Sequence, residues 1–249
     1  MIVLKSPREI NIMRQANQIV AETHHFLKEM IVVGITTAEI DRLGEEFIRN
    51  KGAVPSFKGY RGYPASVCVS INEEVVHGIP SKKRCVEDGD LLSLDIGAFY
   101  EGFHGDAARS FGVGKISNQA RELIEVTEQS FFQGIEKAYP GNRLTDISNQ
   151  IQKFVEGKGF SVVRDYVGHG IGREMHESPQ IPNFGSPGRG PLLKKGMTLA
   201  IEPMVNVGTF RVKTLVDKWT VVTEDRKLSA HYENTIVITD NGPEILSKV

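Results

Sequence analysis

The chain has 249 residues, of which 40% are hydrophobic and 24% charged, so it is long enough to bury a sizeable core. A formal net charge of -1 gives no reason to expect nucleic acid or an anionic membrane surface as a partner. The two cysteines, Cys68 and Cys85, make no disulfide framework, and no apolar run suits a signal peptide or the ~18 residues of a membrane span, which predicts a cytoplasmic protein.

The first half of the chain is predicted to form two helices followed by strands. Ser6 and Glu9 make a capping box around a proline, and apolar residues follow at helical spacing as far as Leu27. A second amphipathic helix is predicted between Gly34 and Gly52, where a glycine closes its C-terminal end.

Residues 91–106 then set two aspartates inside apolar strand sequence on either side of a turn. A hairpin that turns at residues 100–101, with Gly102 taking a positive φ, pairs Asp95 directly with Asp106. Their Cβ atoms would lie roughly 5 Å apart. Two carboxylates that close repel each other, so one must hold a proton or a cation must lie between them.

The second half repeats this order at one common offset. Segment 141–159 repeats the second helix, segment 196–202 repeats the first acidic strand, and Glu202 falls on Asp95. Ser117 caps a longer helix ahead of this unit, and Glu233 is the counterpart of Asp106 if an insertion is assumed before it. We therefore expect an α+β fold with helices outside a central sheet, as one domain, 1–249, with halves of about 1–112 and 113–249.

If the halves pack about a pseudo-twofold axis, four carboxylates converge, those of Asp95, Asp106, Glu202 and Glu233. A lone aspartate in a strand is usually at an edge, but the strand around Asp95 is apolar on both faces, where an unpaired carboxylate is costly. Two divalent cations would balance the four charges. His169, flanked by glycines, is a candidate nitrogen donor, although a histidine in a flexible loop is the simpler interpretation of its motif alone.

The remaining histidines are less informative. His77 lies where a strand meets a turn, and His176 follows His169 by seven residues. Spacing leaves two interpretations open for both, a surface or structural role and a proton-transfer or polarising role beside the metals. His24, His25 and His104 are expected to be solvated.

At these residues the chain resembles the type I methionine aminopeptidases, which have the pita-bread fold. The resemblance covers essentially the whole chain, and 249 residues leave no room for the helical insertion of the type II enzymes. It rests on motifs at residues 70–80, 95–106, 168–172 with 176–177, 200–203 and 233–235. It implies hydrolysis of the N-terminal methionine from nascent chains with a small second residue, through water activated by two metal ions. The donor set suits Mn²⁺, Fe²⁺, Co²⁺ or Zn²⁺.

The resemblance also implies a role for each site residue. The metal ligands would be Asp95, Asp106, His169, Glu202 and Glu233. His77 and His176 would contact the substrate, and Glu202 would also carry the proton. The methionine pocket would be lined by Phe57, Tyr60, Tyr63, Cys68, Met175 and Trp219.

Some positions depart from the commonest bacterial pattern. Phe57 stands where cysteine is frequent and Met175 where phenylalanine is frequent, and Gly97 and Ala107 replace hydroxyl residues beside the ligand aspartates. These departures bear on the shape of the pocket and the tuning of metal affinity.

Two rival functions share the fold. A proline-type peptidase is disfavoured by the aromatic pocket residues, and a non-catalytic binding module is expected to lose metal ligands. The expected partners are nascent polypeptide N-termini, neither nucleic acid nor a membrane. Docking to the ribosome leaves no signal in this near-neutral composition, and because the duplication supplies both sides of the site, a monomer suffices.

Overall fold

The computed structural model describes residues 2–248 as helices packed on antiparallel strands. The helices are α1 (Pro7–Met30), α2 (Thr37–Asn50), α3 (Asn118–Ile135) and α4 (Leu144–Gly157), with a 3₁₀ turn at Tyr60–Gly62. The strands of the first half are β1 (Val54–Pro55), β2 (Val67–Ile71), β3 (Glu74–Val76), β4 (Leu91–Tyr100) and β5 (Phe103–Gly112). Those of the second half are β6 (Ser161–Val162), β7 (Gly168–Gly170), β8 (Glu177–Ile181), β9 (Thr198–Ile201), β10 (Met204–Asn206), β11 (Val212–Thr214), β12 (Val221–Thr223), β13 (Ser229–His231), β14 (Asn234–Thr239) and β15 (Gly242–Ile245).

The four helices expected from the sequence are present with the expected ends. Ser6 caps α1 in a capping box with Glu9, and the Ser117 hydroxyl accepts a hydrogen bond from Ala120 N at the start of α3. The glycines after α2 and α4, Gly52 and Gly159, have φ values of 77° and 83°. This left-handed backbone carries little steric penalty only for glycine, so both helices end there.

Within residues 2–248, the strands form four antiparallel sheets. One has the order β1-β4-β2 with β5 on β4, and another has the order β15-β14-β9-β7-β8. Two small sheets, β13-β10-β6 and β11-β12-β3, extend them. The halves meet where the backbone of Ala108 on β5 exchanges hydrogen bonds with that of Glu233, at 2.9 and 3.4 Å. Main-chain hydrogen bonds therefore link the two halves that carry the candidate ligands.

The β4–β5 hairpin corrects the predicted register. The turn is at Glu101-Gly102, both with positive φ (47° and 88°), which is the two-residue loop that suits the twist of a hairpin. Asp95 consequently pairs with Ala108, and Asp106 pairs with Gly97, so the two aspartates are not directly opposite. Because the shift is two residues, both still lie diagonally on one face.

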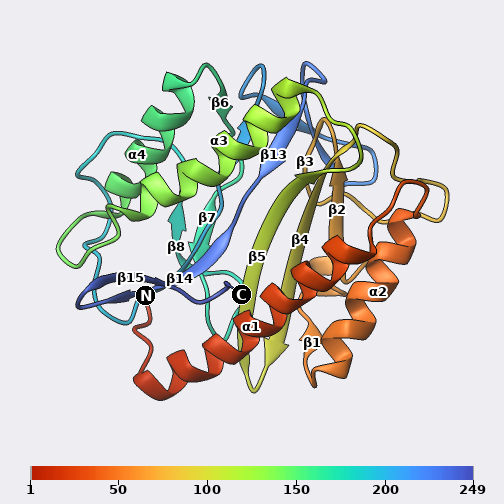
Figure 1. Ribbon diagram of the computed structural model, residues 1–249. Helices are drawn as coiled ribbons and strands as arrows, with labels where there is room; N and C mark the ends of the chain where they lie inside the picture. Colours follow the sequence, from red (N-terminus) through yellow and green to blue (C-terminus); the bar gives the residue numbers. More distant parts are fainter. Residues whose placement is uncertain (1, 249) are drawn as a thin grey trace.

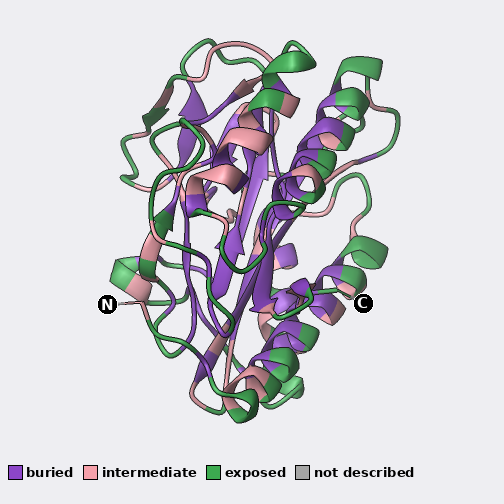
Figure 2. Ribbon diagram, turned by 90° about the vertical axis from the view of Figure 1, so that its left-hand side faces the viewer, coloured by how far each residue is buried: buried purple, intermediate pink, exposed green. Residues whose placement is uncertain are grey.

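The helices cover the face of the strands opposite the one that carries Asp95 and Asp106. In Figure 1, α1 crosses β4 and β5, and α3 crosses β13. Figure 2 shows buried residues concentrated in the strands and on the inward faces of the helices. Within residues 2–248, no helix combines the length and apolar character needed to cross a bilayer.

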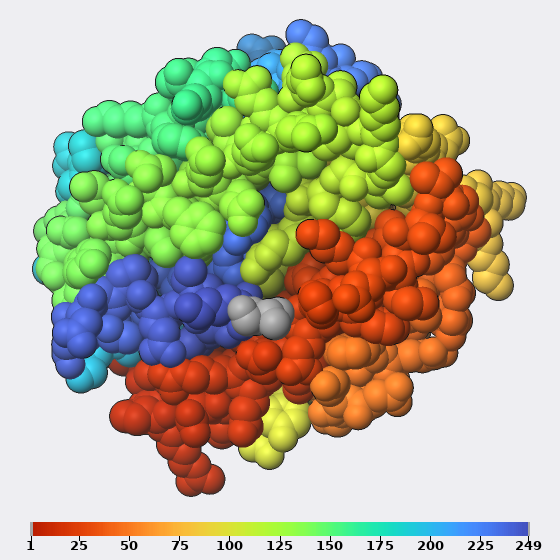
Figure 3. Space-filling view, viewed as in Figure 1, coloured from red at the N-terminus to blue at the C-terminus, as the bar shows by residue number. Residues whose placement is uncertain are grey.

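Between α1 and α3 the surface is hollowed, as Figure 3 shows between the red and green segments. This hollow is a pocket of about 300 Å³ whose lining includes Arg109, Tyr232 and Ser247. It lies on the helix-covered side of the strands.

Candidate metal centre

A cavity of about 150 Å³ brings together every site residue expected from the sequence. Its lining contains the candidate metal ligands Asp95, Asp106, His169, Glu202 and Glu233, the two histidines His77 and His176, and the pocket residues Phe57, Tyr60, Tyr63, Cys68, Met175 and Trp219, with Arg61 in addition. Residues from two stretches of the chain, 57–106 and 169–233, thus face one space.

The acids lie on or next to strands, so their positions follow from the backbone. Asp95 and Asp106 lie within β4 and β5. Glu202 follows β9 directly and precedes a proline, which favours extended backbone, and Asn183 donates a hydrogen bond to its carbonyl oxygen at 2.9 Å. Glu233 occupies the break between β13 and β14.

His169 lies in the middle of β7, between β8 and β9, rather than in a flexible loop. Its Nδ1 is 2.9 Å from Gly170 O, and because a carbonyl only accepts, Nδ1 carries the proton. The free lone pair of Nε2 then faces Asp106 Oδ2 at 3.7 Å and Glu202 Oε1 at 3.6 Å. An imidazole nitrogen held this way has the form in which histidine binds metal ions.

The donor atoms fit a cation. One ligand atom each from Asp106, His169 and Glu233 lie within 4.8 Å of one another. Three buried carboxylate oxygens, Asp95 Oδ1, Asp106 Oδ1 and Glu233 Oε1, have no hydrogen-bond partner among the described residues. Buried polar atoms are rarely left unpaired in proteins, and unpaired oxygens around one imidazole are what a divalent ion would satisfy.

Burial and mutual repulsion shape the charge of the cluster. Burial raises the pKa of Asp95 to about 7. Burial and the neighbouring carboxylates raise the pKa of Asp106, Glu202 and Glu233 well above their ordinary values. Burial lowers the pKa of His169 to about 3, so its ring is neutral. Without a cation, burial and mutual repulsion therefore favour the protonated forms of these acids.

The histidines and aromatic residues form the walls of the cavity. His176 Nδ1 is 2.9 Å from the Tyr60 hydroxyl, and its ring lies 4.2 Å from that of His169. His77 has a φ of 61° just after β3 and packs edge-on against Trp219, with ring centroids 6.1 Å apart. Burial lowers the pKa of His77 to about 4 and also lowers that of His176.

Two of the unusual positions touch each other. A Cβ built on Gly97 would lie 2.8 Å from a ring atom of Phe57 and equally 2.8 Å from Ser56 Cβ, closer than van der Waals contact allows. The aromatic ring at 57 and the side chain at 56 thus share the space that a side chain at 97 would need. The two departures from the commoner pattern are therefore coupled through packing.

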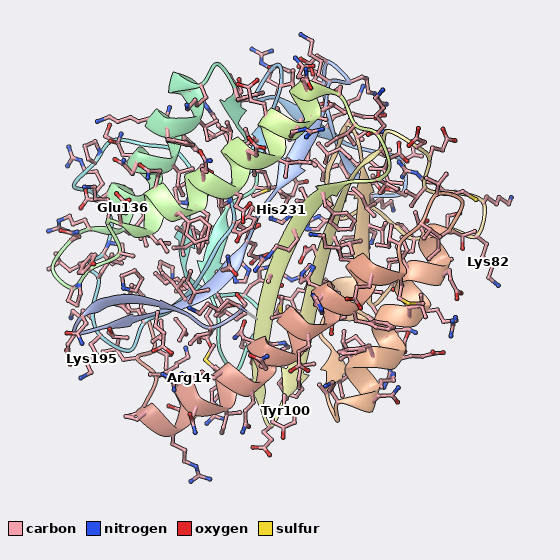
Figure 4. The ribbon with its side chains drawn as sticks, viewed as in Figure 1. Arg14, Lys82, Tyr100, Glu136, Lys195 and His231 are labelled. Carbon is pink, nitrogen blue, oxygen red and sulfur yellow. The ribbon has the colours of Figure 1, made fainter. Side chains whose placement is uncertain are left out.

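Sequence reasoning missed two residues around the acids. His231 is buried, its Nε2 lies 3.7 Å from Glu202 Oε2, and this nitrogen has no hydrogen-bond partner among the described residues; Figure 4 labels it near the centre of the molecule. The alternation of side chains along a strand was the available signal, because residues two apart lie on the same side and His231 lies two residues before Glu233. Arg109 was the other: its guanidinium donates to Glu233 O, to Asn234 Oδ1 at 2.6 Å and to Ser247 O at 3.0 Å. It holds the Glu233 backbone from the helix side.

The expectation that His24 is solvated is wrong. It lies on the buried face of α1, and its Nε2 is 2.8 Å from Ala107 O, to which the neutral ring donates. Burial lowers its pKa to about 3. The spacing of Val20, His24 and Leu27 places the three on one face of the helix, which was a readable sign of burial. His104 is partly buried and its Nδ1 bonds the Ser56 hydroxyl at 2.9 Å, whereas His25 is exposed.

The comparisons with known proteins agree with this geometry. The model of metallopeptidase family M24 matches residues 11–240. A methionine aminopeptidase of Clostridium perfringens is 62% identical over 249 residues, all of both chains. The crystal structure of a methionine aminopeptidase from Thermotoga maritima has a TM-score of 0.98 at 49% identity, with both chains fully covered. A prolidase from Pyrococcus furiosus has a TM-score of 0.81 at 25% identity, covering 99% of this chain and 66% of its own.

These likenesses confirm the predicted α+β class and pita-bread fold, and the metallopeptidase family implies a divalent metal cofactor. The chain belongs to metallopeptidase family M24 and, within it, to the methionine aminopeptidases.

Proposed function

We propose that this protein hydrolyses the bond after an N-terminal methionine, preferring chains with a small second residue. The observation that carries the proposal is one cavity in which unpaired carboxylate oxygens and an imidazole nitrogen meet a wall of aromatic and sulfur-containing side chains. An apolar pocket suits a methionine side chain, and the adjoining acids attract the free α-amino group. Together they select the end of a chain over an internal bond.

The donor set suits two divalent ions, which four ionised carboxylates would balance in charge. Asp95, Asp106, His169, Glu202 and Glu233 would hold them. An oxygen-rich set with one imidazole is compatible with Mn²⁺, Fe²⁺, Co²⁺ or Zn²⁺. Bound there, the ions would bring the pKa of a water molecule towards neutrality and polarise the scissile carbonyl.

The chain's own side chains would do the remaining work. Glu202 would take the proton from the attacking water and pass it to the leaving amine, because its carboxylate borders the cavity. His176 would donate a hydrogen bond to the oxygen that becomes negative in the transition state. Its contact with the Tyr60 hydroxyl fixes the ring for this role. His77 would contact the peptide nitrogen beyond the scissile bond.

We further propose that residues 1–249 act as one catalytic domain in which neither half suffices. The first half carries Asp95 and Asp106, and the second carries His169, Glu202 and Glu233. A monomer acting in the cytoplasm on nascent polypeptides, free or on the ribosome, is consistent with this arrangement.

The decisive experiment compares cleavage of a Met-Ala-Ser peptide with that of X-Pro peptides, with and without a chelator. Metal content is measured on the same sample. Release of methionine that is lost on chelation and restored by Mn²⁺ or Co²⁺ is expected. Preference for X-Pro peptides would instead support the prolidase-type activity, and no cleavage by a metal-loaded sample would support a binding module.

A further inference from the structure

The loop between β7 and β8 supplies two walls of the cavity, Met175 and His176. It is closed by Glu177, the first residue of β8. Glu177 Oε1 accepts hydrogen bonds from the backbone N–H groups of Arg173, at 2.9 Å, and Glu174, at 3.4 Å. The position of His176 therefore depends on where the carboxylate of its neighbour is held.

That carboxylate is held by a residue from the start of the chain. Lys5 Nζ makes an ion pair with Glu177 Oε2, and the two side chains are only 2% and 13% exposed. Lys5 is itself fixed, because its backbone N–H donates to Gly196 O at 2.7 Å. Buried charges persist in proteins when they are paired, and removal of one partner leaves the other without compensation.

The ion pair between Lys5 and Glu177 fills the space next to the backbone of Gly172. A Cβ built on Gly172 would lie 2.5 Å from Glu177 Oε1 and 2.6 Å from Lys5 Nζ. Any side chain at position 172 would overlap the ion pair. Gly172, the last residue of the 168–172 motif, thus has a packing reason that the metal centre does not provide.

The loop has a second link to the N-terminal segment, which provides a contrast. Arg173 bonds Glu9 Oε1 at 3.1 Å, with side chains 66% and 27% exposed. Exposed pairs of this kind contribute little, because water screens them and long side chains lose entropy when held. The buried pair is the link that can fix the loop.

We propose that Lys5 is a positioning residue for catalysis, which acts through Glu177 to hold His176 against the substrate. The inference rests on the proposed function, in which His176 contacts the reacting carbonyl. Without Lys5, the Glu177 carboxylate turns towards water, its hydrogen bonds to the loop backbone are lost, and His176 leaves its 2.9 Å contact with the Tyr60 hydroxyl.

The test uses the full-length, metal-loaded protein and a Met-Ala-Ser peptide. Lys5→Met is expected to lower kcat by about tenfold, since small displacements of a catalytic group are costly. Arg14→Met is the matched control: it removes an exposed ion pair of the same N-terminal segment that joins Arg14 (labelled in Figure 4) to Glu244 and not to the loop, and it should change kcat by less than about twofold.

A double-mutant cycle separates positioning from general damage. In a His176→Ala background, Lys5→Met is expected to cause no further loss of kcat, because the group through which it acts is gone. Adding Glu177→Gln to Lys5→Met should recover part of the activity, since the amide oxygen can still accept from Arg173 N without a buried charge. Losses that multiply in the His176→Ala background would overturn the proposal, as would a Lys5→Met kcat equal to that of the control.

A measurement that does not depend on turnover distinguishes the positioning role of Lys5 from the proposed catalytic role of His176. The ¹⁵N resonances of the His176 ring should shift or broaden in Lys5→Met, while those of the exposed His25 stay unchanged. If His176→Ala retains full activity, the role of His176 in the proposed function is wrong, and the ring resonances alone decide whether Lys5 positions it. An unchanged His176 signal in Lys5→Met refutes the inference.

Discussion

Asp95→Asn is expected to stabilise the metal-free protein at neutral and higher pH while it removes one candidate ligand of the metal centre. The Oδ1 atom of Asp95 is buried without a hydrogen-bond partner among the described residues. In the metal-free protein an ionised carboxylate there is unfavourable, whereas asparagine keeps the size and carries no charge.

The magnitude follows from the pKa of Asp95, which burial raises from 3.8 to about 7. Between these values the folded protein binds a proton that the unfolded chain has released, so the free energy of unfolding of the wild type falls as the pH rises through this window. The full rise corresponds to about 4 kcal/mol. Asparagine does not titrate, so the advantage of the variant should grow from near zero at pH 4 to as much as about 4 kcal/mol at pH 8.

Guanidinium unfolding from pH 5 to pH 8 in the presence of a chelator measures this difference. Asp240→Asn is the control, because Asp240 is exposed in a surface pair with Lys195 and should change stability by less than about 0.5 kcal/mol at any pH. Excess metal should reverse the order, since the wild type gains binding energy that the variant loses. A metal-free variant no more stable than the wild type at pH 8 would refute the reasoning.

Three further outcomes are expected. Glu202→Gln should lower kcat on a Met-peptide by about 100-fold or more, and normal turnover with metal bound would remove its role in proton transfer. The buried His24, whose pKa is about 3, contributes stability that is lost as the pH falls from about 6.5 to 3; His24→Gln cannot take up that proton and should flatten the acid side of the denaturation profile. Gly97→Thr should lower the thermal midpoint in the wild type and somewhat less in a Phe57→Cys background, where the contact with Ser56 Cβ remains, and fully additive effects in the double variant would contradict the packing explanation.

Much of the fold was predictable because its signals are local. The capping residues Ser6 and Ser117 and the closing glycines Gly52 and Gly159 mark the helix ends within a few residues, and the structure confirms them. The repeat that aligns Glu202 with Asp95 needed only comparison of the chain with itself.

The hairpin register was not predictable from its residues. It depends on Glu101 adopting a φ of 47°, which a glutamate rarely does, so composition favoured a turn one residue earlier. The error did not separate the two aspartates because a shift of two residues preserves the face.

Long-range partners were the other limit. Nothing near Lys5 in the sequence indicates that it pairs with Glu177, and nothing near Gly97 indicates that Ser56 and the Phe57 ring crowd its side-chain space. Such contacts join segments that only the folded chain brings together. Alternation could have revealed His231, and helical spacing could have revealed His24, so those two were readable and were missed.

The segment that links the two halves of the chain has a practical consequence. The segment from Gly114 to Ser117 links β5 to α3 and is largely exposed, which is where a chain tolerates interruption. A cut there leaves Asp95 and Asp106 on one fragment and His169, Glu202 and Glu233 on the other. Fused to two proteins of interest, such fragments would make release of methionine a reporter of their association, with a signal that a chelator switches off.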